Sequence, residues 1–226
     1  MGRRRADVAT GTASGVEAAV NAFQRGQPVC IHDADDREGE TDLIYPAHAV
    51  TPAAVARLRN DAGGLVCVAV SDAVAEAFGL PFLEDALDHP AAEDHDLSYD
   101  DRSSFSLSVN HRDTDTGITD EDRALTIRAL ASAAAAPERT DFAAEFRSPG
   151  HVSLLRAAPG LLADRRGHTE LGIVLAEAAD VPSAVVVCEM LDDETGGALS
   201  PADAALYAES HGIPYLEGAA IVERLG

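Results

Sequence analysis

The stretch PVCIHDADDREGETDLIY, residues 28–45, contains the pattern that decides the fold. Its ends, residues 28–32 and 43–45, are short apolar runs of the kind that form buried strands. The segment between them, residues 33–42, carries six carboxylates in ten residues and is far too polar for a core. The pattern therefore predicts two strands joined by an acidic loop that is fixed at both ends.

Helices and strands alternate along the rest of the chain. Strands are predicted at residues 65–70, 104–110, 151–156 and 184–189, from short apolar or alternating runs. Residues 1–12 are expected to be a frayed tail, and residues 81–103 a long irregular connection. This order predicts a layered α/β (α+β) fold, with helices on the faces of a sheet, in a single domain over residues 1–226. Helices are predicted to begin after Ser14, Thr51, Ser71, Thr119 and Ser200, and from Thr169.

The formal charge of −22 over 226 residues excludes several classes of function. All 17 basic residues are arginine, so chemistry through a lysine Schiff base or a lysine-bearing P-loop is excluded. Binding to nucleic acid or to a membrane surface is not expected, because it depends on clustered positive charge. Such an acidic, lysine-free composition predicts a halophilic protein, in which high salt screens the self-repulsion.

The three cysteines predict a reducing compartment. Cys30, Cys67 and Cys188 lie far apart in apolar runs and form no CxxC pair, which is typical of free buried thiols. No apolar stretch approaches the roughly 18 residues that a membrane span needs. No apolar signal-peptide segment follows the arginines at residues 3–5. We therefore expect a cytoplasmic protein with no membrane partner.

The acidic loop is the first candidate site. Glu38 and Glu40 alternate, so they share a face in extended chain. Crowded carboxylates repel one another unless a cation neutralises them, and Mg²⁺ typically binds one or two carboxylates together with water and substrate oxygens. A solvated acidic turn in a very acidic protein would give the same pattern. The loop alone therefore does not decide between a cation site and a solvated turn.

The segment RRGHTE, residues 165–170, is the second candidate site. It opens a predicted helix, where backbone N–H groups, the Thr169 hydroxyl and a guanidinium can hold a phosphate. His168 can complete a nitrogen and oxygen shell for Mg²⁺ or Mn²⁺. A plain helix cap with surface arginines is the other interpretation.

Three more residues are candidates for an active site, provided that the fold brings them close to the other candidate residues. His151 follows a Pro-Gly pair that predicts a turn, and a histidine there can act as acid or base near neutral pH. Glu189 ends an apolar strand, a position that suits an acid–base group. Thr116 lies in a turn before a helix and can help to hold phosphate. Each of the three also fits a purely structural role.

Together these segments resemble one family, the 3,4-dihydroxy-2-butanone 4-phosphate synthases of riboflavin biosynthesis, from about residue 14 to residue 222. Outside the acidic loop, the resemblance is most specific in SSFSLSVNHRDTDTGITDEDRALTIR (103–128) and FRSPGHVSLLR (146–156). The spacing of His151, Arg165, His168 and Glu189 also matches the family. Four such segments in the right order are far more specific than any one of them.

The acidic loop departs from the commonest family form at three positions. Asp35, Gly39 and Thr41 stand where Glu, Asn and Gly are usual, and the resulting REGETD segment is similar to the archaeal branch. The resemblance implies a monofunctional, homodimeric lyase with sites near the subunit interface. It also implies a mixed parallel and antiparallel sheet flanked by helices.

The reaction that the resemblance implies converts D-ribulose 5-phosphate to L-3,4-dihydroxy-2-butanone 4-phosphate and formate. It would proceed by metal-assisted enolisation, dehydration, skeletal rearrangement and formate loss, with Mg²⁺ or Mn²⁺ at two ions per site. The metal would be held by Glu38, Glu40 and His168. The catalytic group would comprise His151 and Glu189, with Asp33 and Cys67 lining the site. The substrate would contact Arg37, Glu38, Asp42, Thr116, Arg165, Arg166, Gly167, His168, Thr169 and Glu189, with Thr116 from the partner subunit.

Two other functions compete with this one. Another metal-dependent sugar-phosphate lyase or isomerase on the same scaffold would differ in its products, since the synthase releases one formate for each ketose consumed. A non-catalytic module that shares the fold with nucleotide-binding, RNA-modification proteins would need a basic groove, which this acidic sequence does not provide.

Overall fold

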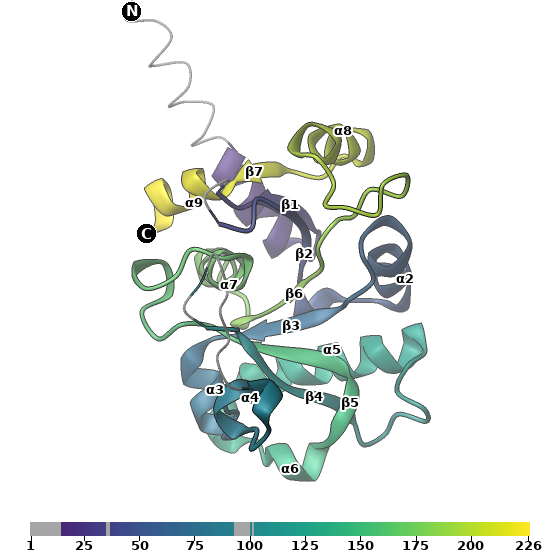
Figure 1. Ribbon diagram of the computed structural model, residues 1–226, viewed down its shortest axis with the longest axis vertical. Helices are drawn as coiled ribbons and strands as arrows, with labels where there is room; N and C mark the ends of the chain where they lie inside the picture. The colour runs from purple at the N-terminus through teal and green to yellow at the C-terminus, as the bar shows by residue number, and fades with distance from the viewer. Residues whose placement is uncertain (1–14, 35–36, 93–99, 101) are drawn as a thin grey trace, which may run out of the picture.

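The computed structural model describes residues 15–34, 37–92, 100 and 102–226 (Figure 1). Within these residues a seven-stranded sheet has the order β4-β5-β3-β6-β2-β1-β7. The β1/β7 and β3/β5 pairs are parallel and the other pairs are antiparallel, which confirms the mixed sheet. The strands are β1 Val29–His32, β2 Thr41–Pro46, β3 Cys67–Val70, β4 Phe105–His111, β5 Phe146–Arg156, β6 Ala184–Val187 and β7 Tyr215–Glu217.

Helices cover both faces of the sheet, with α2, α5 and α8 on one side and α7 and α9 on the other (Figure 1). Predicted caps are present, since the side chains of Thr51, Ser71, Thr119 and Ser200 each accept a hydrogen bond from a backbone N–H of the first turn. The helices are residues 15–24, α2 Pro52–Asp61, α3 Asp72–Phe78, α4 Leu83–Ala86, α5 Asp120–Ala134, α6 Phe142–Glu145, α7 His168–Ala178, α8 Pro201–His211 and α9 Gly218–Leu225.

The alternation of side chains along each strand divides the interior into two cores. In β6, Val186 packs in the core that contains Leu58 of α2 and Leu130 of α5. The neighbouring Val185 packs in the core that contains Leu171 of α7. Both faces of the central strands are therefore buried, which explains why their sequences are apolar throughout.

The structure corrects three expectations. The connection at residues 81–103 is not wholly irregular, because it contains α4 and the 3₁₀ turn Pro90–Ala92. The chain also forms β7 and α9, which were not predicted. Residues 149–150 do not make a turn before a strand, because β5 already begins at Phe146. The expected frayed tail at residues 1–12 and the cap at Ser14 lie outside the described residues.

Candidate functional site

A cavity of about 860 Å³ lies where the acidic loop meets the start of α7 and the end of β6. The loop between β1 and β2 supplies the carboxylates, and the segment before α7 supplies the arginine and histidine. The lining residues are Arg37, Glu38, Glu40, Asp42, Gly63, Leu65, Cys67, Arg102, Ser103, Ser104, Phe105, Leu155, Arg165, His168, Thr169, Val187, Glu189 and Leu191. The fold thus brings together two candidate sites that are more than a hundred residues apart in the sequence.

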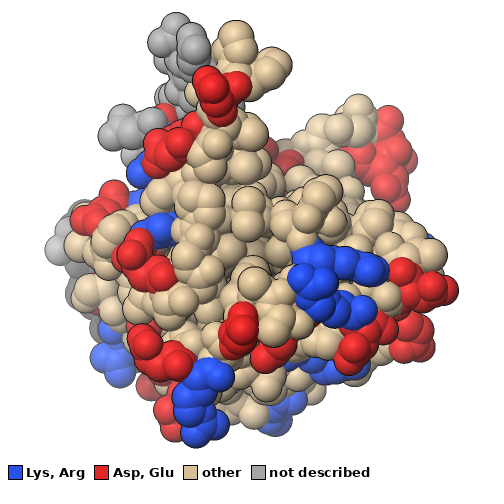
Figure 2. All heavy atoms as spheres, turned by 90° about the horizontal axis from the view of Figure 1, so that it is seen from below, with Lys and Arg blue, Asp and Glu red and all other residues tan. Residues whose placement is uncertain are grey.

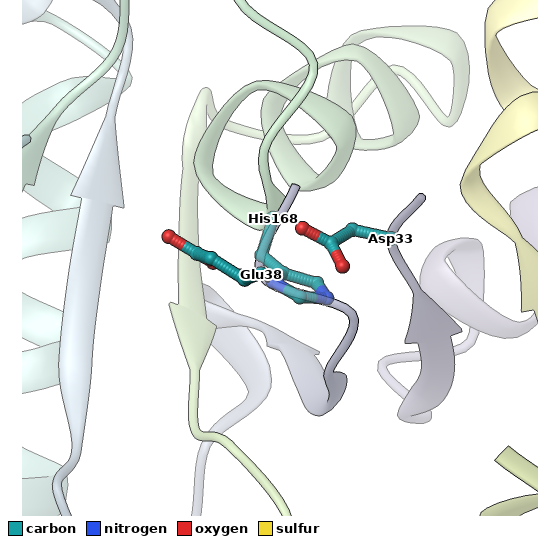
Figure 3. A group of neighbouring side chains, drawn as sticks. All are labelled: Asp33, Glu38 and His168. Carbon is teal, nitrogen blue, oxygen red and sulfur yellow. Dashed lines mark ion pairs between the residues drawn. The ribbon is translucent and has the colours of Figure 1, made fainter. Parts of the chain in front are cut away.

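His168 lines this cavity, and its ring lies beside the carboxylates of Asp33 and Glu38 (Figure 3). Its Nε2 lies 3.1 Å from the carbonyl oxygen of Ile31, which can accept a hydrogen bond from it. The other nitrogen, Nδ1, is 3.5 Å from Oε2 of Glu38 and 3.6 Å from Oδ1 of Asp42. A backbone carbonyl that takes the Nε2 proton leaves the Nδ1 lone pair for a cation. Ligand atoms of Asp33, Glu38 and His168 lie within 4.8 Å of one another, so they can share an ion.

Asp33 shapes the acidic loop. Its Oδ1 accepts a hydrogen bond from the backbone N–H of Glu40 at 3.1 Å, and its Oδ2 accepts one from Nε of Arg37 at 3.4 Å. The side chain is fully buried. Asp33 therefore closes the loop on itself and orients Arg37, in addition to facing the prospective metal position.

The electrostatics of the cavity fit a divalent cation. A hydrogen bond from His168, followed by the charges of His168, Arg37 and Arg165, lowers the pKa of Glu38 despite its burial. Burial raises the pKa of Glu40 to about 7, and repulsion from Glu189 and the neighbouring loop carboxylates adds to the effect. Burial also raises the pKa of Asp42 to about 6. Carboxylates pushed toward protonation in this way are relieved when a cation binds among them.

Mg²⁺ affinity is expected to rise with pH from about 6 to about 9. Burial alone would lower the pKa of His168, but the carboxylates of Asp42, Glu38 and Asp33 outweigh it and raise the value to about 9. The cation must displace this proton, and below pH 7 also the proton of Glu40. Each displaced proton changes the affinity by up to about ten-fold per pH unit. Calorimetry in buffers of different ionisation enthalpy should show proton release, and a pH-independent affinity would contradict the assignment.

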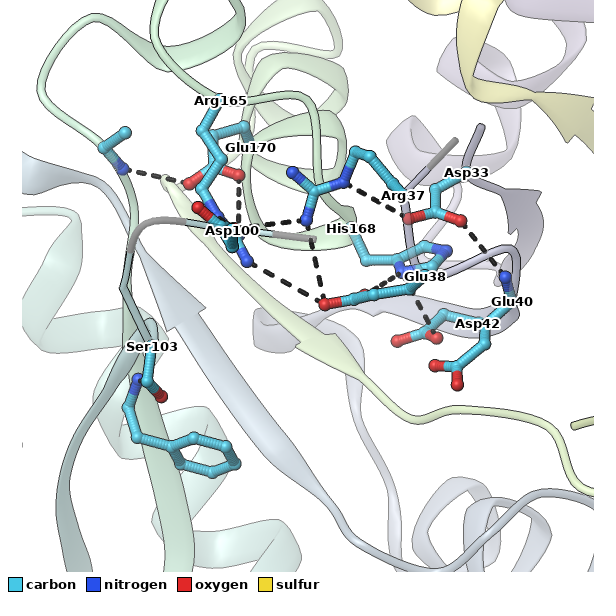
Figure 4. A network of polar contacts seen from close by, with 12 residues as sticks. Asp33, Arg37, Glu38, Glu40, Asp42, Asp100, Ser103, Arg165, His168 and Glu170 are labelled. Atoms are coloured by element: carbon cyan, nitrogen blue, oxygen red, sulfur yellow. Dashed lines mark hydrogen bonds and ion pairs between the residues drawn. The ribbon is translucent and has the colours of Figure 1, made fainter. Parts of the chain in front are cut away.

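Two arginines face each other at one side of the cavity (Figure 4). Arg165 Nη1 pairs with Oε2 of the buried Glu170 at 2.9 Å, and its Nε contacts Oδ2 of Asp100. The same Asp100 oxygen lies 3.3 Å from Nη2 of Arg37. A Cβ on Gly167 would lie 2.7 Å from Arg165 Nη1 and 2.9 Å from Arg37 Nη2, so a larger residue there would displace the two guanidiniums. The pair forms a site for an anion, which Asp100 fills with its carboxylate.

The variant Asp100→Asn is expected to bind inorganic phosphate about three- to ten-fold more tightly. The carboxylate of Asp100 competes for both guanidiniums, and the amide removes its charge. Calorimetric titration with phosphate measures the change. Asp88→Asn makes the same charge change at an exposed position of the same connection and serves as control. Weaker binding by Asp100→Asn would show instead that Asp100 holds the arginines in place.

Glu189 and Cys67 both line the cavity. Glu189 follows β6, and its backbone is held on both sides. It forms an isolated antiparallel β-bridge with Asp42, and its carbonyl oxygen accepts a hydrogen bond from Gly63 N at 2.6 Å. Burial, reinforced by the charge of Asp42, raises the pKa of the Cys67 thiol to about 12. Cys67 is therefore a neutral thiol that shapes the wall and not a thiolate nucleophile.

Five predicted substrate or catalytic residues are not among those that line this cavity: Asp33, Thr116, His151, Arg166 and Gly167. Asp33 and Gly167 still adjoin it, because they lie against the lining residues Arg37 and Arg165. Arg166 is exposed, and its Nε donates to the carbonyl of Leu162 at 3.4 Å. His151 and Thr116 are both exposed beside Asn110, whose amide contacts His151 and packs against Gly117. The protomer thus carries two separate groups of candidate residues.

Glu170, Asp100 and Ser103 were not among the predicted site residues. Glu170 is fully buried against Arg165 and also accepts a hydrogen bond from Ala158 N at 3.0 Å. Its position in the RRGHTE segment, before an otherwise apolar helix, was the signal that could have identified it. Asp100 had no such signal, because it is one of many acids in its connection.

The chain is similar to proteins of one family. A family model described as 3,4-dihydroxy-2-butanone 4-phosphate synthase matches residues 17–224. The 3,4-dihydroxy-2-butanone 4-phosphate synthase of Archaeoglobus fulgidus is 51% identical over 219 residues, which cover 92% of each chain. The riboflavin biosynthesis protein RibBA of Bacillus subtilis is 32% identical over 179 residues, 79% of this chain and 41% of that protein. A crystal structure of 3,4-dihydroxy-2-butanone 4-phosphate synthase in complex with two magnesium ions is 30% identical, with a TM-score of 0.78 over 91% of this chain and 94% of that one.

Proposed function

Because this chain belongs to the 3,4-dihydroxy-2-butanone 4-phosphate synthase family, we propose that its cavity binds D-ribulose 5-phosphate together with Mg²⁺. The family reaction forms L-3,4-dihydroxy-2-butanone 4-phosphate and formate, a step of riboflavin biosynthesis. The observation that carries the proposal is the position of the Glu38 and His168 pair beside the Arg37 and Arg165 pair in one cavity. The first pair suits a cation and the second a phosphate.

Each group in the cavity has a part in this proposal. Glu38 and His168 hold the metal, with Asp33 or Glu40 completing the set, and two ions per site agree with the relative that binds two magnesium ions. Bound Mg²⁺ or Mn²⁺ would polarise the ketose oxygens as a Lewis acid. Glu189 moves protons on the substrate carbons that face it. Arg165, Gly167 and Thr169 hold the phosphate at the start of α7, and Asp42 binds a substrate hydroxyl.

A homodimer would complete the site. His151 and Thr116 are exposed and lie outside the cavity of their own protomer, while exposed apolar side chains, among them Leu65, Phe105 and Leu191, stand at its rim. In a symmetric dimer the same surface of each protomer meets the other, so an exposed pair of residues can enter the partner's cavity. We place His151 and Thr116 of the partner subunit over the substrate.

We further propose that the enzyme works in a reducing, salt-rich cytoplasm. Its three cysteines are free and buried. Among the described helices, none is both long and apolar enough to cross a bilayer. Carboxylates are spread over the face of the molecule seen in Figure 2, with arginines interspersed among them.

Raising KCl from about 0.1 M to about 2 M is expected to raise the melting temperature. The charge of −22 repels itself, and the Debye length falls from about 10 Å at 0.1 M to about 3 Å at 1 M. Calorimetric unfolding scans measure the shift. NaCl at the same ionic strength should reproduce the shift, because screening depends on ionic strength. Equal melting temperatures at the two KCl concentrations would contradict the halophilic assignment.

The proposed function is tested by measuring formate. Purified protein in high KCl receives D-ribulose 5-phosphate, first with Mg²⁺ and then with excess EDTA. We expect one formate for each ketose consumed with Mg²⁺, and none with EDTA. Consumption of the ketose without formate would point to the competing lyase or isomerase. Absence of any reaction in folded, Mg²⁺-loaded protein would contradict the proposal.

A further inference from the structure

Asn110 is a buried polar residue beneath the exposed His151. It ends the regular part of β4 and is 4% exposed. Val109 pairs with Val152 of β5, but the next residue, Asn110, pairs with Arg147. Residues 148–151 therefore form a bulge that packs on β4, where the Ser148 hydroxyl donates to the carbonyl of Ser108, and His151 is left exposed. Bulges of this kind commonly aim a side chain.

The Asn110 amide fixes His151 through two hydrogen bonds. Oδ1 accepts from the backbone N–H of His151 at 2.8 Å, and Nδ2 lies 3.2 Å from Nδ1 of the imidazole. The first bond sets the orientation of the amide, because a flipped amide would point its NH₂ at another N–H. Nδ2 is therefore the donor and Nδ1 the acceptor.

Gly117 packs against the Asn110 amide and restricts its rotation. Its φ is +87°, and a Cβ at this position would lie 2.0 Å from Asn110 Nδ2. The bare backbone of Gly117 thus packs directly on the amide and leaves it no room to turn. The same glycine follows Thr116, whose hydroxyl donates to Asp122 Oδ2 at 3.4 Å, so the two exposed residues lie close to one another.

We propose that Asn110 is a positioning residue that orients the His151 ring and selects the tautomer with its proton on Nε2. An Nδ1 that accepts the hydrogen bond from Asn110 carries no proton, so the ring N–H lies on Nε2 of this exposed residue. A proton on Nδ1 would set two donors against each other. His151 consequently presents an N–H donor to the substrate and stabilises negative charge on a substrate oxygen as the ketose is enolised. This role rests on the proposed function, in which His151 enters the partner's cavity.

The tautomer can be observed without turnover. Imidazole ¹⁵N chemical shifts of the resting enzyme distinguish the two nitrogens, and the His151 signals are assigned by their loss in His151→Gln. We expect a protonated Nε2 and an unprotonated Nδ1. In Asn110→Asp, a carboxylate of the same shape accepts a hydrogen bond, so the proton should move to Nδ1. A wild-type spectrum with the proton on Nδ1 would overturn the proposal.

Kinetics of the same variants provide the second measurement. Asn110→Asp turns the Nε2 donor into an acceptor, so kcat should fall about a hundred-fold while KM changes little, as for loss of a donor to a developing oxyanion. Asn60→Asp adds the same charge at an exposed site and should retain wild-type values. Wild-type kcat in Asn110→Asp would overturn the positioning role. Lack of formate from the wild-type enzyme would instead remove the proposed function, so the two failures are distinct.

Discussion

Replacing Glu38 with glutamine is expected to reduce formate production at least about a thousand-fold, because a metal that polarises the substrate contributes several kcal/mol to the transition state. Glu38 is the carboxylate nearest to Nδ1 of His168, and the amide keeps its shape but loses its charge. His168→Ala should have the same effect. Turnover and Mg²⁺ binding by calorimetry should fall together in both variants.

The fold should survive the loss of Glu38. Its carboxylate contributes to the repulsion that raises the pKa of Glu40 and Asp42, so a neutral amide relieves the metal-free site. The amide also loses the contacts with His168, Arg37 and Arg165 that lower the pKa of Glu38, so the melting temperature should change little or fall slightly. Glu121→Gln, an exposed substitution on α5, provides the matched control. Near-normal turnover in Glu38→Gln would show that the metal is held elsewhere.

Replacing His151 with glutamine is expected to lower kcat by a factor of about 10² to 10⁴, the usual range for a residue that assists proton transfer or charge development. Mg²⁺ affinity should not change, because His151 does not line the cavity that holds Glu38 and His168. A loss of kcat without a loss of Mg²⁺ affinity would distinguish His151 from the cavity residues Glu38 and His168. His48→Gln, at an exposed histidine on another surface, should leave both quantities unchanged. Loss of Mg²⁺ binding in His151→Gln would contradict the arrangement.

The fold followed from local patterns where those patterns were strong. The apolar runs that became β1 and β6 are buried on both faces, and the capping hydroxyls of Thr51 and Thr119 began their helices as predicted. The short strand β7 was not predictable, since three residues give no measurable alternation and the strand exists through its pairing with β1.

The site was predictable only in part, for a physical reason. Glu38 and His168 could be proposed from the sequence because each lies in a compact polar segment. The fold brings these two segments together. The exposure of His151 follows from a shift in the pairing of β4 and β5, which no local sequence pattern encodes. Asp100 belongs to the site because its carboxylate pairs with Arg37 and Arg165, and these ion pairs depend on the whole fold.

The site shared between two protomers is tested most directly by mixing two inactive variants. Glu38→Gln lacks an intact cavity but keeps His151, and His151→Gln keeps its cavity but lacks the donor. When equal amounts exchange subunits, half of the dimers contain one of each chain and therefore one complete site. Formate production should then return to about a quarter of the wild-type rate. If the mixture stays inactive while subunit exchange is demonstrated, His151 acts within its own protomer and the shared site is wrong.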